Sequence, residues 1–273
     1  MGTRYWSYAL KLAVPLVCYY FCLYAMNSSS VTFARRFYGA ETAAVVSLAV
    51  SCSHIITMLN QAVNNAWAPW LYERLNQKKY KEISKAYGGI LAIYGFMVMG
   101  VMLLGPEMTK ILGGSSYAES ATLVPVCLLV GSTQLLNTLY VNLMTHKKKT
   151  QVIMSVTMIF SIVCLLFKLL FVRWLPYEYI MYPDLITYCG IEITLTIITK
   201  RYYNATVYPM RYIAIYIGSL SAVMLLCHFL YANTLMRVGF IVAYAVVFIA
   251  IACKYRKQIM AFFKKKQRKA EVR

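Results

Sequence analysis

The sequence predicts an all-α integral membrane protein, a bundle of about eight transmembrane helices. Three observations lead to this fold class. Of the 273 residues, 60% are hydrophobic and only 14% are charged, whereas a soluble domain is nearer half apolar and a quarter charged. The apolar residues gather in segments of about 20, the length that crosses a bilayer as a helix. The Lys and Arg residues lie in short runs between those segments, as expected for loops at a membrane surface.

The predicted spans follow one another with short connections, which favours antiparallel neighbours. They are residues 8–26, 41–63, 88–104, 122–144, 150–172, 182–199, 212–232 and 235–253. Gly105 and Pro106 end the third span. The sixth span is the least apolar, because it contains Asp184 and Glu192. Residues 66–86 are expected to continue the second span and then to lie along the membrane interface.

The loops differ strongly in positive charge. Those on one side of the membrane hold 22 Lys and Arg residues and those on the other side hold 5, while Lys168 falls within a span. The difference alternates from loop to loop without exception. It predicts an even number of spans in the cytoplasmic cell membrane, with both termini in the cytoplasm. The net charge of +19 therefore indicates contact with anionic lipid head groups rather than with nucleic acid.

Sequence features of enzymes and metal sites are missing. The eight cysteines form no CxxC pair and lie within or beside apolar segments, so they are expected to be small buried hydrophobic residues. No Walker loop, GxSxG or HExxH motif occurs, and His54, His146 and His228 are scattered. The outer loops are too short for a catalytic domain. The sequence therefore predicts no enzymatic activity, no metal site and no cofactor.

The second span has one polar half and one apolar half when it is drawn as a helix. The polar half consists of Ser47, Ser51, Ser53, His54, Thr57, Asn60, Gln61, Asn64 and Asn65. Polar side chains that face lipid are costly, so this half is expected to face the bundle interior as the wall of a hydrated cavity. The alternative is that these side chains only form hydrogen bonds between helices.

Four further residues within the predicted spans are candidates for a binding or cavity-lining role. Gln134 and Asn137 belong to a polar set on the fourth span. Lys168, near the outer end of the fifth span, is expected to extend its ammonium toward the membrane surface. Glu192, in the middle of the sixth span, either pairs with Lys168, binds a proton or is simply neutral. Among the 24 tyrosines, those at positions 19, 20 and 24 are the candidates for stacking on sugars.

Several segments resemble the Wzx-type polysaccharide flippases of the multidrug/oligosaccharidyl-lipid/polysaccharide exporter superfamily. The resemblance covers most of residues 5–200. It rests first on Leu59-Asn60-Gln61 followed by Ala66-Trp67-Ala68-Pro69-Trp70-Leu71-Tyr72-Glu73-Arg74. Further matches are Ala9-Leu10-Lys11 with Pro15, Asn27-Ser28-Ser29, Gly105-Pro106-Glu107 with Leu112-Gly113-Gly114, and Lys147-Lys148-Lys149-Thr150. The chain departs from the family at Ser30-Val31, where Asp-Arg is frequent, at Lys168, where Asn is common, and at Tyr182-Pro183-Asp184, which replaces a Gly-rich start.

The resemblance implies a second-lobe six-helix bundle over residues 1–200, two additional transmembrane helices over 201–253 and a basic cytoplasmic tail over 254–273. The implied function is outward transport of an undecaprenyl-diphosphate-linked oligosaccharide for surface polysaccharides such as O-antigen of lipopolysaccharide, or capsule. Lys11, Lys168 and Arg35 or Arg36 would offset the diphosphate charge. The first lobe would come from a separate chain or from a second copy of this one. A multidrug exporter and a membrane polymerase or glycosyltransferase are the alternatives.

Overall fold

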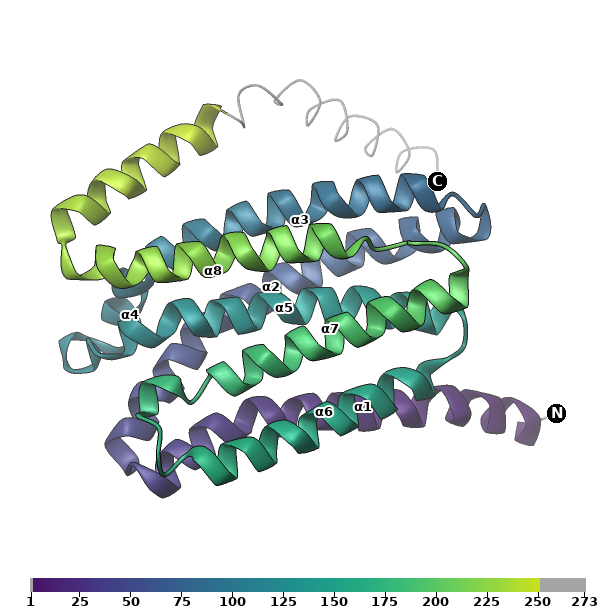
Figure 1. The fold of residues 1–273 in the computed structure, drawn as a ribbon, viewed down its shortest axis with the longest axis horizontal. Helices are drawn as coiled ribbons and strands as arrows, with labels where there is room; N and C mark the ends of the chain where they lie inside the picture. The colour runs from purple at the N-terminus through teal and green to yellow at the C-terminus, as the bar shows by residue number, and fades with distance from the viewer. Residues whose placement is uncertain (1, 251–273) are drawn as a thin grey trace. The chain divides into compact units, whose positions relative to one another are not determined.

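The computed structural model describes the backbone of residues 2–250 and the side chains of residues 9, 10 and 13–250. Within that range the chain is helical and contains no strand (Figure 1). Its long helices are α1 (Gly2–Phe37), α2 (Ala40–Asn76), α3 (Tyr80–Leu103), α5 (Ser120–His146), α6 (Thr150–Phe171), α7 (Tyr182–Tyr203) and α8 (Met210–Ala232). The short helix α4 (Gly105–Gly113) and the single turns η1 (Ser115–Tyr117) and η2 (Tyr177–Tyr179) lie between them.

Each of the first seven predicted spans falls within one long helix, to within one residue at its ends. Five helices, α2, α3, α5, α6 and α8, are long and apolar enough to cross a membrane. The chain therefore has the character of a multi-pass membrane protein. As predicted, the second helix continues past Pro69; it ends at Asn76, and α3 begins at Tyr80. The position of residues 66–86 along the membrane interface stays a prediction.

The connections between the long helices gather at two ends of the bundle. At one end, the side chains of His146 and Asn76 are hydrogen-bonded at 3.0 Å, and the rings of Tyr80 and Tyr203 pack edge to face with centroids 5.9 Å apart. These contacts join the α2–α3, α5–α6 and α7–α8 connections, which are the Lys- and Arg-rich loops of the sequence. We call this the basic end.

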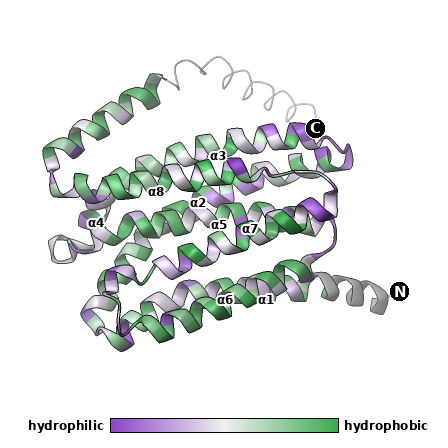
Figure 2. Cartoon of the chain, in the orientation of Figure 1, coloured by the Kyte–Doolittle hydropathy of each residue, from purple (hydrophilic) through white to green (hydrophobic). Residues whose placement is uncertain are grey.

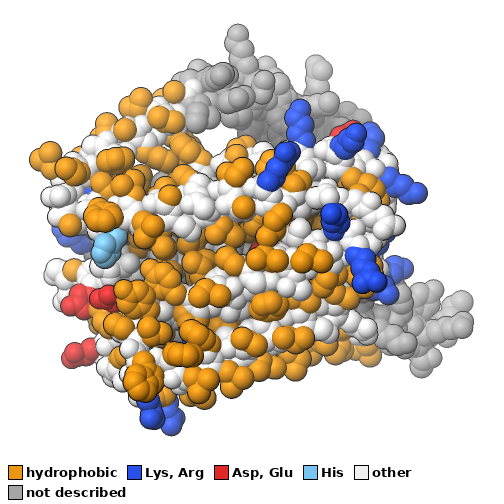
Figure 3. All heavy atoms as spheres, in the orientation of Figure 1, with side chains coloured by type: hydrophobic (Ala, Val, Ile, Leu, Met, Phe, Trp, Pro, Cys, Tyr) orange, Lys and Arg blue, Asp and Glu red, His pale blue; other side chains and the backbone are white. Residues whose placement is uncertain are grey.

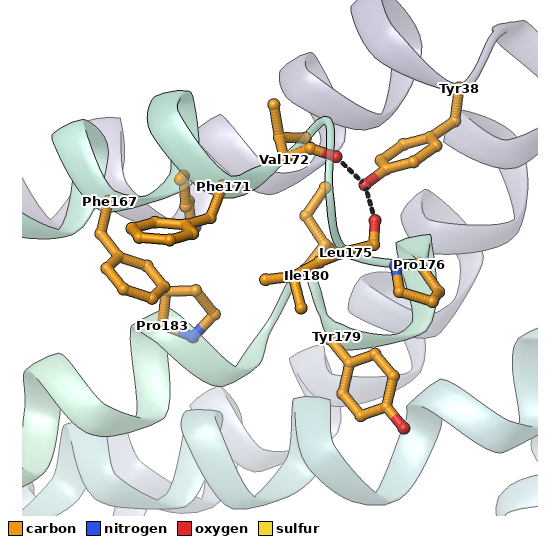
Figure 4. Close-up of a pocket in the computed structure, with 10 residues that line it drawn as sticks. Tyr38, Phe167, Phe171, Val172, Leu175, Pro176, Tyr179, Ile180 and Pro183 are labelled. Atoms are coloured by element: carbon orange, nitrogen blue, oxygen red, sulfur yellow. Dashed lines mark hydrogen bonds between the residues drawn. The ribbon is translucent and has the colours of Figure 1, made fainter.

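The remaining connections meet at the opposite end. The hydroxyl of Tyr38, which follows α1, donates to the backbone carbonyls of Val172 and Leu175 after α6 (Figure 4). The hydroxyl of Tyr177 lies 3.5 Å from the carboxylate of Glu119, just before α5. The two ends thus sort the loops as the charge count predicts. Hydrophobic residues dominate the middle of the helices in Figure 2, and most visible Lys and Arg side chains gather at the basic end in Figure 3.

Helix α5 forms the centre of the bundle. Of its 27 residues, 22 are buried, and it packs most closely against α2 and α7. A helix that is enclosed on all sides needs no apolar stripe, which explains why the fourth predicted span is weakly sided. Helix α1 packs mainly on α6, and Tyr19 and Met26 anchor it in the interior.

From Phe229 onward the described chain belongs to a second unit. Its described part contains an apolar helix, Thr234–Ala250, which is shorter than the five helices that are long enough to cross a membrane. This helix begins one residue before the eighth predicted span. The last three residues of that span and the basic tail, residues 254–273, lie outside the described residues.

Candidate functional site

The polar half of α2 lies largely on the surface of the described bundle. Ser47, Ser51, His54 and Gln61 are exposed, as is Asn65. The expectation that this half faces the bundle interior is therefore wrong for these residues. The reason is that α2 packs with its small and apolar side chains. The buried set on the α5-facing part of the helix is Ala43, Val46, Ala49, Cys52, Ile56 and Asn60.

The exposed hydroxyls of α2 are bonded within their own helix. Ser51 donates to the carbonyl of Ser47 at 2.9 Å, and Thr57, which is half-buried, donates to that of His54 at 2.7 Å. Ser53 does the same with Val50 at 2.6 Å. These hydroxyls therefore do not join α2 to a neighbouring helix, and the hydrogen-bonding alternative does not explain their presence on this face.

Two asparagines of α2 do bond across helices. Asn60 is buried; its amide donates to the carbonyl of Gly131 on α5 at 3.0 Å, and its oxygen accepts a hydrogen bond from Tyr94 of α3. Asn64 accepts a hydrogen bond from Asn142 of α5 at 2.7 Å. For Asn60 and Asn64, interhelical bonding is thus a sufficient explanation.

The two candidates on α5 differ in their surroundings. The Gln134 amide reaches the side-chain oxygen of Asn27 on α1 at 3.3 Å. Asn137 is wholly buried, and neither its amide nitrogen nor its oxygen has a hydrogen-bond partner among the described residues. A buried amide without partners is costly, so Asn137 marks a polar spot inside the bundle.

Lys168 does not extend toward the membrane surface; that expectation is wrong. Its side chain is buried, with 3% of the residue exposed. The ammonium lies 2.7 Å from both carboxylate oxygens of Asp184. It also donates to the hydroxyls of Ser29 at 2.9 Å and Ser30 at 2.6 Å. The buried carboxylate and the two serine hydroxyls together offset the lost hydration of the ammonium.

This buried ion pair joins three helices, since Ser29 and Ser30 belong to α1, Lys168 to α6 and Asp184 to α7. The Ser30 hydroxyl also contacts the Asp184 carboxylate at 2.9 Å. Ser30, Lys168 and Asp184 are members of the three segments at which the chain departs from the flippase pattern. In the tertiary structure these departures meet in one cluster, and each supplies a partner to the others.

Sequence reasoning missed Asp184 as a partner, although a signal was present. Lys168 is three residues before the end of α6, and Asp184 is two residues after the start of α7. Antiparallel neighbours joined by a short connection bring such positions to the same depth. Lys168 pairs with Asp184, and Glu192, the partner considered from the sequence, lies two turns further along α7.

A small cavity adjoins the ion pair at the opposite end of the bundle. Phe167, Phe171 and Pro183 line one part of it, and Tyr38 with Leu175 lines another (Figure 4). Its volume is about 10 Å³, which is close to the minimum for a single water molecule. The cavity is therefore too small to hold a sugar or a diphosphate.

Glu192 is the second buried carboxyl. It is 0% exposed, and neither carboxylate oxygen has a hydrogen-bond partner among the described residues. Its backbone carbonyl accepts a hydrogen bond from Thr196 at 2.7 Å, and the Thr196 hydroxyl lies 2.6 Å from that of Tyr140 on α5. The side chain of Glu192 thus points into an interior that offers it no cation.

The remaining sequence candidates lie on or near helix α1. The side chain of Lys11 lies outside the described residues. Arg35 and Arg36 are exposed in the last turn of α1, at the opposite end. Of the three tyrosines considered for sugar stacking, Tyr19 is buried in the core, whereas those at positions 20 and 24 are exposed by 58% and 69%.

Comparisons with protein-family models, curated proteins and solved structures gave no match. Support for a function therefore comes from the geometry and from the resemblance of the sequence motifs. In the described part of the chain, no three His, Cys, Asp or Glu side chains are placed to hold a metal ion. Two features remain that a structural bundle does not need: an exposed polar face on a membrane-length helix, and an unpartnered carboxyl at the centre.

Proposed function

We propose that this chain is the second-lobe half of a transporter that moves an undecaprenyl-diphosphate-linked oligosaccharide outward across the cytoplasmic membrane. The observation that carries the proposal is the exposed, mainly polar stripe of α2, defined here as Ser47, Ser51, His54, Gln61 and Asn65, which is interrupted by the exposed Met58. Within the proposal the chain spans the membrane eight times, the basic end faces the cytoplasm and both termini lie there.

The length of the polar stripe matches that of a membrane passage. From Ser47 to Asn65 the helix rises about 27 Å, which is close to the hydrocarbon thickness of about 30 Å. Polar groups at this depth are costly against lipid tails, so water or another protein surface must cover them. A hydrophilic head group that crosses the membrane needs a polar wall of this extent, while its lipid tail remains in the bilayer.

Exposed residues of α1 suit a sugar-phosphate cargo. Tyr20 and Tyr24 on α1, the helix before α2, expose rings of the kind that stack on sugars. Arg35 and Arg36 are positioned at the outer end to offset the diphosphate charge. Lys168 is removed from this role because Asp184 neutralises it. The polar character of the stripe favours this cargo over the apolar cargo of a multidrug exporter.

The proposal requires a second body opposite the stripe. Transport by alternating access rocks two bodies against each other around a site between them. The described bundle offers one wall, and within the proposal a first-lobe body supplies the other. We expect that this chain alone does not restore polysaccharide export in a flippase-deficient cell without that partner. Full rescue by a product shown to be monomeric would contradict the two-body argument.

The stripe is tested by replacing Ser51 with Trp in the cell that encodes the chain. Deletion of the gene is expected to lower surface polysaccharide and to raise lipid-linked oligosaccharide in the inner leaflet. The wild-type gene restores export, and Ser51→Trp fails because the indole blocks the polar wall while insertion is unchanged. The matched control is Ile93→Trp, at a residue of α3 that is 69% exposed and lies at a similar distance from the outer end of its helix.

Two results would refute this proposal. The first is a deletion that changes neither surface polysaccharide nor the amount of lipid-linked oligosaccharide. The second is full export by Ser51→Trp at a wild-type level of membrane insertion. If Ile93→Trp also failed, the loss would reflect bulk on any helix face, and the stripe would not be special.

A further inference from the structure

The two buried carboxyls of α7, those of Asp184 and Glu192, have very different surroundings. Asp184 receives an ammonium and the hydroxyl of Ser30, and the thiol of Cys164 lies 3.4 Å from it. Glu192 is equally enclosed but has no hydrogen-bond partner for either oxygen among the described residues. The fold therefore neutralises the first carboxylate with a cation and leaves the second without one.

Among the described residues, the groups that face Glu192 from the surrounding helices carry no positive charge. Those close enough to interact with it electrostatically are Tyr19 of α1, Tyr87 of α3, Tyr140 of α5, Tyr216 of α8 and, on α7 itself, Cys189. All are neutral at physiological pH. The hydroxyl of Tyr87 also lacks a hydrogen-bond partner among the described side chains.

The helix register places a polar neighbour at the same level. Helices α5 and α7 run in the same direction, because α6 lies between them in the chain and returns to the opposite end. The hydroxyls of Tyr140 and Thr196 meet at 2.6 Å. Asn137 is one turn before Tyr140, and Glu192 is one turn before Thr196. The unpartnered amide and the unpartnered carboxyl therefore occupy the same level of the α5–α7 contact.

An ionised carboxylate in such a place would cost several kcal/mol, since neither a cation nor a donor offsets its lost hydration. The neutral acid avoids that cost. We propose that Glu192 binds a proton in this conformation and exchanges it when the bundle opens, so that the proton is the coupling ion of the transporter. The coupling of the proton to transport rests on the proposed function. The proton site itself follows from the enclosure of Glu192.

The exchange is a simple acid dissociation. When water enters between α5 and α7, the O–H bond of the Glu192 carboxyl breaks and the proton passes to water. The carboxylate that remains can accept hydrogen bonds from the Asn137 amide and from the Tyr87 hydroxyl, which have no partner among the described residues in the closed state. Closure then requires a proton from the side that is open, because only the neutral acid is readily enclosed again.

The test is infrared spectroscopy of the full chain reconstituted in lipid vesicles. At neutral pH the wild-type protein should show a carbonyl stretch of a protonated carboxyl that is absent in Glu192→Gln. The matched control is Glu178→Gln, at an exposed residue before α7, which should keep the band. Transfer to D₂O should shift the band as the carboxyl exchanges its proton. Glu192→Asp should retain an exchangeable band, and the helical content of each variant verifies folding.

Each outcome bears on the proposal. If wild type has no band that Glu192→Gln removes, Glu192 is ionised and the proposal is wrong. If the band is present but neither shifts in D₂O nor responds to a rise in pH, the carboxyl is inert and the proposal is also wrong. If the band exchanges but the gene deletion leaves polysaccharide export unchanged, the proton site stands and the proposed function fails.

Discussion

Replacing Lys168 by Met should be one of the most destabilising single changes in the chain. The side chain is replaced by one of similar length, so the loss is mainly electrostatic. Asp184, with 1% of the residue exposed, would keep only the Ser30 hydroxyl at 2.9 Å and the Cys164 thiol at 3.4 Å. Removal of one partner of a buried pair costs about 3–5 kcal/mol, because the other charge stays buried without compensation.

The lower part of that range applies within a membrane, where the unfolded chain also finds partners for its polar groups. We therefore expect a loss of about 3 kcal/mol, roughly a 150-fold change in the folding equilibrium. The double variant Lys168→Met with Asp184→Leu should recover most of it, since replacing a whole buried pair by apolar side chains is often close to neutral. The control Lys110→Met, at an exposed residue of α4, should change stability by less than about 0.5 kcal/mol.

The measurement is the free energy of unfolding in mixed micelles, obtained by titration with a denaturing detergent and followed by helical content. Wild type, the two single variants, the double variant and the control form one series. The reasoning is refuted if Lys168→Met costs no more than Lys110→Met. It is also refuted if the double variant is as unstable as the sum of the two single variants, because the ion pair would then not be the source of the loss.

The remaining predictions concern topology and helix packing. Cysteines placed at Ser115 and Lys148 of a cysteine-free variant should be labelled from opposite sides of the membrane, and labelling of both from one side would contradict the proposed topology. Gly190→Ala should lower stability by about 1–3 kcal/mol, because its methyl group would overlap the ring of Phe160 on α6. The methyl group of Gly89→Ala on α3 would meet open space, so this change should stabilise the protein by up to about 1 kcal/mol. Thermal unfolding of both variants tests the two predictions, and equal effects on stability would refute the packing argument.

The first seven helices could be predicted from the sequence, since each predicted span falls within one long helix to within one residue, although α1 and α2 extend well beyond the spans predicted for them. The sorting of their connections into a basic end and an opposite end was also predictable. Both properties depend on the composition of continuous segments: a bilayer selects apolar runs of a given length, and positive charge accumulates in alternate loops. Neither requires knowledge of which helix packs against which.

The pairing of side chains could not be predicted in this way. Lys168 and Glu192 were both visible as intramembrane charges, yet the fold pairs Lys168 with Asp184 and encloses Glu192 alone. The two candidate partners lie about two turns apart on α7, so the choice depends on depth, which the short connection indicates, and on which faces of α6 and α7 meet. A linear pattern does not specify which faces meet.

The same limit applies to the polar half of α2. Its amphipathic character was predicted from the sequence, since it follows from the helical repeat alone. Which half of the helix is buried was decided by the tertiary structure, in which Ala43 and Ala49 are buried while Ser51 and His54 are left exposed. Sequence periodicity identifies a face, but only the shape and polarity of the neighbouring helices determine what that face meets.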